Sequence, residues 1–227
     1  KMKAVTFSYD DGVTQDQRLI KLFNKYGLKA TFNLNSELLG NGGHLIREDV
    51  TVAHVKPRPC EVKNIYEGHE VAAHTLTHPF LPNLDDAEVI RQVEEDRKNL
   101  SEIVGYEVVG MAYPCGGENY NEHIAELIKN NTGIKYCRTI VSNHSFDLQE
   151  NLHTFKPTVY HHAEWDKMFE LTKQFIELQP DKPQLLYIWG HAYEFDIHGT
   201  WERMEELCKL ISGHDDIFYG TNHEVLL

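Results

Sequence analysis

The stretch Ala4-Val5-Thr6-Phe7-Ser8-Tyr9-Asp10-Asp11-Gly12 joins a short apolar run to an adjacent pair of carboxylates. A second stretch of the same kind follows later, where Glu70-Val71-Ala72-Ala73 leads into His74-Thr75-Leu76-Thr77-His78-Pro79. One Asp and two His would give a metal ion three protein ligands and leave a position for water. The two stretches therefore predict a catalytic rather than a structural metal site at the ends of two strands.

The residue types suit this chemistry. Two ionised carboxylates side by side, as in Asp10-Asp11, repel each other unless a cation or a proton lies between them. A metal on one leaves the other free to take a proton from water. His74 and His78 face the same side if their segment makes one helical turn, and neutral imidazole binds zinc and other late divalent ions. The alternatives are an ordinary acidic turn and two hydrogen-bonded histidines near a helix start.

The rest of the chain alternates between strand-like and helix-like segments. Apolar residues recur at helical spacing in Asp16–Tyr26 and Asp85–Val104, and again around Ile124, Phe169 and Met204. Repeated β-then-α units favour a parallel sheet covered by helices, and about seven units in one domain, residues 1–227, suggest an incomplete (β/α) barrel. The predicted strands are Ala4–Phe7, Ala30–Leu34, Glu70–Ala73, Val108–Tyr113, Ile134–Ile140, Leu185–Trp189 and Asp216–Tyr219.

In such barrels the reacting groups lie where strands end and βα-loops begin. Asp10 and Asp11 follow the first predicted strand, His74 follows the third and His191 follows the sixth. The least regular stretch, Gly40–Pro59, is interpreted as an extended βα-loop because regular elements resume on both sides of it.

The composition of the chain limits the classes of partner that are expected. The chain has 227 residues, of which 41% are apolar and 25% charged, as in ordinary globular proteins, and its formal net charge is −13. A nucleic-acid partner is not expected, since phosphate binding needs a basic face. No apolar run reaches the roughly 18 residues of a membrane span. If Met2 is near the native start the protein is expected in the cytoplasm, and if a leader was removed it is expected to be secreted or cell-surface.

Four cysteines, Cys60, Cys115, Cys137 and Cys208, are widely spaced and form no C-x-x-C pair. We therefore expect mostly free, buried thiols and neither a zinc knuckle nor a redox pair.

Ser8-Tyr9-Asp10-Asp11-Gly12 resembles the T-F-D-D-G motif of the NodB-homology polysaccharide deacetylases, carbohydrate esterase family four. His74-Thr75-Leu76-Thr77-His78-Pro79 resembles the family's H-[ST]-x-x-H-P motif, and Leu185–His191 resembles its late strand ending in a catalytic histidine. The resemblance spans nearly the whole chain. It implies a distorted, incomplete (β/α) barrel.

The resemblance also implies roles for matching residues. Asp10 would be the catalytic base, and His191 the general acid. Asp11, His74 and His78 would bind one divalent metal ion, with zinc as the first expectation and cobalt or nickel as alternatives.

Two family motifs are altered. The third, roughly R-P-P-Y-G, corresponds to Met111–Gly116, with Ala112 at the position of the arginine that holds the base. Arg138 is the candidate replacement, and an Arg that only packs or lies at the surface is the alternative. The backbone amide of Cys115 would stabilise the oxyanion. The fourth motif, which tunes the catalytic histidine, is not recognisable; possible stand-ins are Asp147, Glu164-Trp165 and Asp166.

Candidate substrate-binding residues are Tyr113, Trp189 and Arg138. The aromatic faces would stack on sugar rings, although they would equally well fill the barrel core. His144 and the pair His161-His162 follow strand-like runs and are further candidates for lining the cleft.

The leading hypothesis is a metal-dependent hydrolase that removes acetyl groups from an N-acetylated sugar or polysaccharide. A rival on the same scaffold would hydrolyse a small non-sugar amide or an O-acetyl ester. A third hypothesis is an inactive, metal-retaining carbohydrate-binding protein, although a binder would not need both Asp10 and His191. The sequence predicts no particular oligomeric state.

Overall fold

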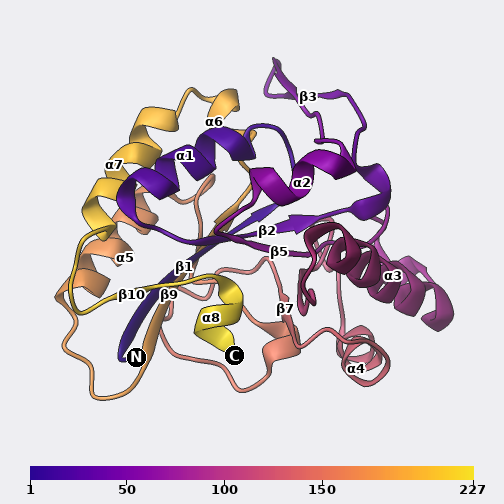
Figure 1. The fold of residues 1–227 in the computed structure, drawn as a ribbon. Helices are drawn as coiled ribbons and strands as arrows, with labels where there is room; N and C mark the ends of the chain where they lie inside the picture. Colours follow the sequence, from indigo (N-terminus) through magenta and orange to yellow (C-terminus); the bar gives the residue numbers. More distant parts are fainter.

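A curled parallel sheet forms the centre of the computed structural model, which describes residues 1–227 (Figure 1). Its strands run in the order β7-β6-β5-β2-β1-β9-β8, and β10 pairs with the first half of β1. Every pairing within this sheet is parallel. The strands are β1 (Lys3–Asp10), β2 (Ala30–Leu34), β5 (Glu70–Ala73), β6 (Gly110–Ala112), β7 (Tyr136–Arg138), β8 (Val159–Tyr160), β9 (Gln184–Gly190) and β10 (Phe218–Tyr219).

Helices cover the outside of the sheet, with α1, α5 and α7 along one part and α2, α3 and α4 along another (Figure 1). Their apolar faces join the sheet in a cluster of 44 buried residues. The α-helices are α1 (Asp16–Tyr26), α2 (Pro59–Ile65), α3 (Asp86–Val104), α4 (Glu122–Asn131), α5 (Trp165–Glu177), α6 (Glu194–Ile197), α7 (Trp201–Ile211) and α8 (Asn222–Leu226); short 3-10 turns are η1 (Ser36–Leu38), η2 (Leu81–Asn83) and η3 (Leu152–Thr154).

The two edges of the curled sheet are linked by the segment that leads into β8. Phe155 forms a parallel bridge with Arg138 of β7, and its N–H donates to the Cys137 carbonyl at 2.9 Å. A few residues later, Val159 and Tyr160 pair with β9. This irregular link confirms the predicted distorted, incomplete (β/α) barrel, because only one short segment spans the gap between the edges.

The predicted loop Gly40–Pro59 contains the antiparallel hairpin β3 (His44–Arg47) and β4 (Val50–Ala53), which projects from the barrel (Figure 1). The segment links β2 to α2, as the predicted extended βα-loop should, but the hairpin within it was not predicted. Six of its eight strand residues are exposed, so the hairpin lacks the buried alternating face by which a strand is detected in a sequence.

No helix combines the length and the apolar character that crossing a bilayer requires.

Candidate metal centre and active site

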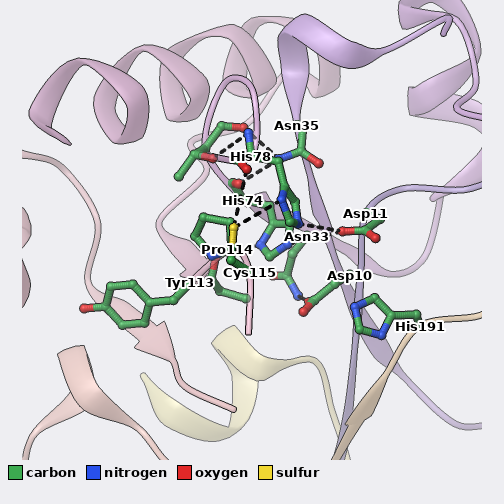
Figure 2. Close-up of polar contacts among 12 residues, drawn as sticks. Asp10, Asp11, Asn33, Asn35, His74, His78, Tyr113, Pro114, Cys115 and His191 are labelled. Atoms are coloured by element: carbon green, nitrogen blue, oxygen red, sulfur yellow. Dashed lines mark hydrogen bonds and ion pairs between the residues drawn. The ribbon is translucent and has the colours of Figure 1, made fainter. Parts of the chain in front are cut away.

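Five polar side chains gather at the carboxyl ends of three strands of the sheet, β1, β5 and β9 (Figure 2). Asp10 is the last residue of β1 and Asp11 follows it; His74 comes directly after β5, with His78 four residues further on; His191 follows β9. Parallel strands end at one rim of the sheet, which brings together residues that are distant in the sequence.

Asp11, His74 and His78 form the candidate metal centre. The Asp11 Oδ1 atom lies 3.4 Å from His74 Nε2 and 3.3 Å from His78 Nε2. The three candidate ligand atoms all lie within 4.8 Å of one another, and they are the one group of this kind in the chain. The centroids of the two imidazole rings are 4.9 Å apart, and their planes meet at 75°.

The donor set fits a divalent cation. Asp11 Oδ1 is buried and has no hydrogen-bond partner in the chain, although two ring nitrogens face it. His74 Nδ1 lies 2.7 Å from the Ala112 carbonyl oxygen, an acceptor, so Nδ1 must carry the proton and Nε2 presents its lone pair. A lone carboxylate oxygen opposite two imidazole nitrogens is the ligand chemistry of zinc and similar ions.

The backbone at this centre is strained. Asp11, Thr75, His78 and Cys115 all have positive φ angles, of 81°, 75°, 62° and 72°. Non-glycine residues seldom adopt this region, and such conformations gather at functional sites because the surrounding structure holds them there.

Asp10 is held by a buried cation. Its two oxygens accept from Arg138 at 2.9 and 2.6 Å, and Asn33 donates to Oδ1 at 2.8 Å. Burial alone would raise the pKa of Asp10, but the charge of Arg138, together with His74 and His191, lowers it below its usual value. The carboxylate is thus kept ionised, as a proton acceptor must be.

His191 is paired with Glu194, the first residue of α6. Its Nδ1 lies 3.3 Å from Glu194 Oε1, and its backbone N–H donates to the same oxygen at 2.7 Å. Burial would lower the pKa of His191, but Glu194 above all, with Asp11 and Asp10, raises it to about 9. The imidazole is therefore protonated at neutral pH, as a proton donor must be.

Glu194 is itself held by hydrogen bonds from His161 and Tyr160. His161 Nε2 donates to Glu194 Oε1 at 2.9 Å, while His161 Nδ1 accepts from the Tyr9 hydroxyl at 3.0 Å. Tyr160 donates its hydroxyl proton to Glu194 Oε2. His161 is fully buried, so it lies behind the site and not on the cleft wall where the sequence suggested it.

The predicted stand-ins for the partner of His191 were wrong. Asp147 pairs with Lys182, Glu164 with His144 and Asp166 with Arg203, all away from His191. Glu194 was missed, although its spacing three residues after His191 at a helix start was a usable signal.

The site opens into a cavity of about 590 Å³, within the size range of small-molecule sites. Trp189 lines it and stacks on Tyr160, with ring centroids 4.3 Å apart. Tyr113 also lines it, but its hydroxyl donates to the His153 carbonyl and its ring points away from the ligand group (Figure 2). Arg138 is 1% exposed, lies outside the lining and contacts Asp10, so the substrate contact suggested for it was wrong and the contact with the base is present.

Cys115 also lines the cavity. Its backbone N–H donates to no acceptor in the chain and is therefore free to donate to a ligand. Its thiol lies 3.7 Å from His78 Nδ1. All four cysteines are free, but only Cys137 and Cys208 are buried, while Cys115 is half-buried and Cys60 exposed.

The polysaccharide deacetylase family model matches residues 1–137. Among curated proteins, the chain is 27% identical over 129 residues to a peptidoglycan-N-acetylglucosamine deacetylase of Listeria monocytogenes, covering 56% of this chain and 24% of the relative. It is 25% identical over 121 residues to a putative polysaccharide deacetylase of Bacillus subtilis, covering 53% and 39%. The chain thus spans less than half the length of these relatives.

Solved structures share the fold. A family 4 carbohydrate esterase from Streptomyces lividans, solved with acetate, superposes with a TM-score of 0.56 at 15% identity, over 92% of this chain and 88% of that one. A pseudoenzyme of the same family from Bacillus anthracis gives 0.61 at 17% identity, over 100% and 66%. With more than half of its residues matched by the family model, the chain belongs to the polysaccharide deacetylases, carbohydrate esterase family four.

Proposed function

We propose that this protein is a metal-dependent hydrolase that removes acetyl groups from an N-acetylated sugar or polysaccharide. The observation that supports this most is the arrangement of Asp11, His74 and His78 around one point, flanked by an ionised Asp10 and a protonated His191. A carbohydrate-binding protein would need neither a proton acceptor nor a proton donor beside its ligand group.

The proposed mechanism assigns one task to each group. A divalent ion held by Asp11, His74 and His78 would, when bound, acidify a water molecule and polarise the acetyl carbonyl. Asp10 takes a proton from the attacking water as the water oxygen bonds to the acetyl carbonyl carbon. The free N–H of Cys115 donates to the carbonyl oxygen as it becomes an oxyanion.

Collapse of the tetrahedral state then breaks the carbon–nitrogen bond. His191 transfers its proton to the departing nitrogen, and Glu194 stabilises the positive imidazole beforehand. The products are acetate and a free amino sugar. Tyr160 offers partly exposed aromatic surface against which a sugar ring would pack, whereas Trp189 is buried between Tyr160 and Arg138.

The experiment is acetate release from N-acetyl oligosaccharides, acetylated xylan and small amides, measured on chelated protein and again after addition of zinc, cobalt or nickel. Metal-restored release from one substrate class would support the hydrolase and identify the class. Release from only small amides or acetylated xylan would instead favour the amide or O-acetyl ester rival.

The binder hypothesis has a specific reason to be tested, because the similar Bacillus anthracis protein is described as a pseudoenzyme and a mutant of it as having restored activity. Asp10→Asn separates the hypotheses. If the protein is an enzyme, this substitution should lower the rate about 10²- to 10⁴-fold and leave metal binding intact. Sugar binding without acetate release, by wild type and variant alike, would refute the hydrolase.

A further inference from the structure

The hairpin insert, residues 40–59, is attached to the segment that carries Asp11. The Thr14 N–H donates to the Val55 carbonyl at 2.8 Å, and Gln15 Nε2 donates to the Ala53 carbonyl at 2.8 Å. Lys56, only 6% exposed, donates from Nζ to the Asp11 carbonyl oxygen. Three contacts therefore fix the end of this insert against the loop after β1.

One side chain of the insert reaches the candidate metal centre itself. His54 Nε2 lies 3.4 Å from Asp11 Oδ2, the carboxylate oxygen that faces away from His74 and His78. The His54 ring packs edge-on against Tyr193, with centroids 5.4 Å apart. The His54 side chain thus has a fixed position at the cavity wall and one polar partner, Asp11.

The two oxygens of Asp11 have different surroundings. Oδ1 is buried without a hydrogen-bond partner and faces the two ligand imidazoles, while Oδ2 meets His54. His54 does not belong to the group whose ligand atoms lie within 4.8 Å of one another. It is therefore placed to hold the carboxylate from outside and not to bind the ion.

We propose that His54 is an outer-sphere positioning residue of the metal centre and that the hairpin insert is part of that centre. The inference rests on the proposed metal-dependent function and adds a residue to it. By donating to Oδ2, His54 fixes the rotation of the Asp11 carboxylate so that Oδ1 alone points at the ion. Lys56 holds the same residue through its backbone, which has the strained φ of 81°.

Removal of such outer-sphere partners typically weakens metal binding by about 10- to 100-fold. His54→Ala should therefore raise the cobalt dissociation constant by about this factor. His54→Gln should recover most of the loss, since the Gln side-chain amide places a donor the same number of bonds from the backbone. The matched control is His44→Ala, an exposed histidine of the same hairpin that has no side-chain partner and no place in the cavity lining; its constant should be unchanged.

The measurement is titration of metal-free protein with cobalt against a competing chelator, together with the visible absorption spectrum of the bound ion and the melting temperature of the metal-free form. The proposal predicts weaker binding with the same absorption bands, because the ligands themselves stay the same. A changed band intensity in His54→Ala would show that His54 is a direct ligand, and would overturn the proposal.

Equal cobalt affinity in wild type and His54→Ala would also overturn it, while leaving the proposed hydrolase intact. A wild-type protein that binds no cobalt, zinc or nickel would instead refute the metal centre, and with it the proposed function. A lowered melting temperature of metal-free His54→Ala would show general damage to the fold. In that case His54→Gln decides the question. If His54→Gln recovers the wild-type melting temperature but not the cobalt affinity, the proposal is wrong.

Discussion

At the residue scale, the adjacent carboxylates of Asp10 and Asp11 contact different partners. Asp10 is fully engaged by a buried guanidinium, whereas Asp11 presents one oxygen to two imidazole nitrogens and the other to His54. Backbone geometry produces this division, because the chain turns from extended strand at Asp10 to a φ of 81° at Asp11. The two side chains consequently serve different partners although they are neighbours in the sequence.

The Asp10–Arg138 pair leads to a prediction about acid pH. In Arg138→Met the pKa of Asp10 should rise, so the acid limb of the rate profile moves to higher pH, while Arg138→Lys should shift it less. Breaking a buried pair should also cost about 3–5 kcal/mol of unfolding free energy. Because the folded-state pKa of Asp10 is lowered, this stabilisation is present above its unfolded pKa and is lost as pH falls. Denaturant unfolding between neutral and acid pH measures the loss of stability, and pH–rate profiles measure the shift of the acid limb. An acid limb that does not move would contradict the role of Arg138.

The Glu194–His191 pair leads to a prediction about alkaline pH. Glu194→Gln removes the charge that keeps the pKa of His191 at about 9. If the pKa returns to an ordinary value of about 6.5, the protonated fraction at pH 8 falls by about 30-fold. The alkaline limb of kcat should move to lower pH, with the acid limb left in place. A uniform loss of rate at every pH would indicate damage to the fold instead, and circular dichroism with the melting temperature serves as the control.

At the element scale, the turn after β1 requires glycine. Gly12 has a φ of +61°, and a Cβ there would lie 2.5 Å from Leu34 Cδ2, so the Leu34 side chain would have to shift. Gly12→Ala should lower the free energy of unfolding by about 1–3 kcal/mol. It should also weaken metal binding, because the neighbouring Asp11 would be displaced. Gly27→Ala is the matched control, because its φ is +69° but nothing lies within 4 Å. The control should lose only about 1 kcal/mol and keep its metal affinity; chemical denaturation and cobalt titration measure the two effects, and equal losses in both variants would contradict this account.

Elements with strong periodicity could be predicted from the sequence, and weakly patterned ones could not. The range Asp16–Tyr26 is predicted and observed as α1, because its apolar residues share one face and Gly27 ends it. The short strand β8 was not among the predicted strands, although a strand-like run was noted before His161, because two residues carry no period. The hairpin β3–β4 was missed because its stability comes from backbone pairing at the surface and not from a buried face.

At the scale of the whole molecule, the site residues that stand in local sequence motifs could be predicted, and those joined only by long-range contacts could not. The ligands Asp11, His74 and His78 stand in local motifs, each directly after a strand, so the sequence indicates them. His54 and Asp11 are 43 residues apart, and Arg138 and Asp10 are 128 apart. Such contacts depend on how the sheet curls and on where the hairpin insert lies, because β7 and β1 are not neighbours in the sheet and His54 follows β4 outside it. Residue spacing does not contain that information, which is why Arg138 could only be suggested and His54 was not.

The closed arrangement of strands also predicts that metal and fold stabilise each other. The ligands come from the ends of β1 and β5, which are separated only by β2, so an unfolded chain cannot hold them together. An ion at 100 times its dissociation constant should add about 2.7 kcal/mol, or about 5–10 °C in melting temperature for a chain of this size. Asp11→Ala should abolish this shift, while Asp181→Ala, which removes an exposed carboxylate outside the site, should keep it. Thermal unfolding of chelated protein with and without added zinc measures the effect, and an equal rise in wild type and Asp11→Ala would show that the stabilising ion binds elsewhere.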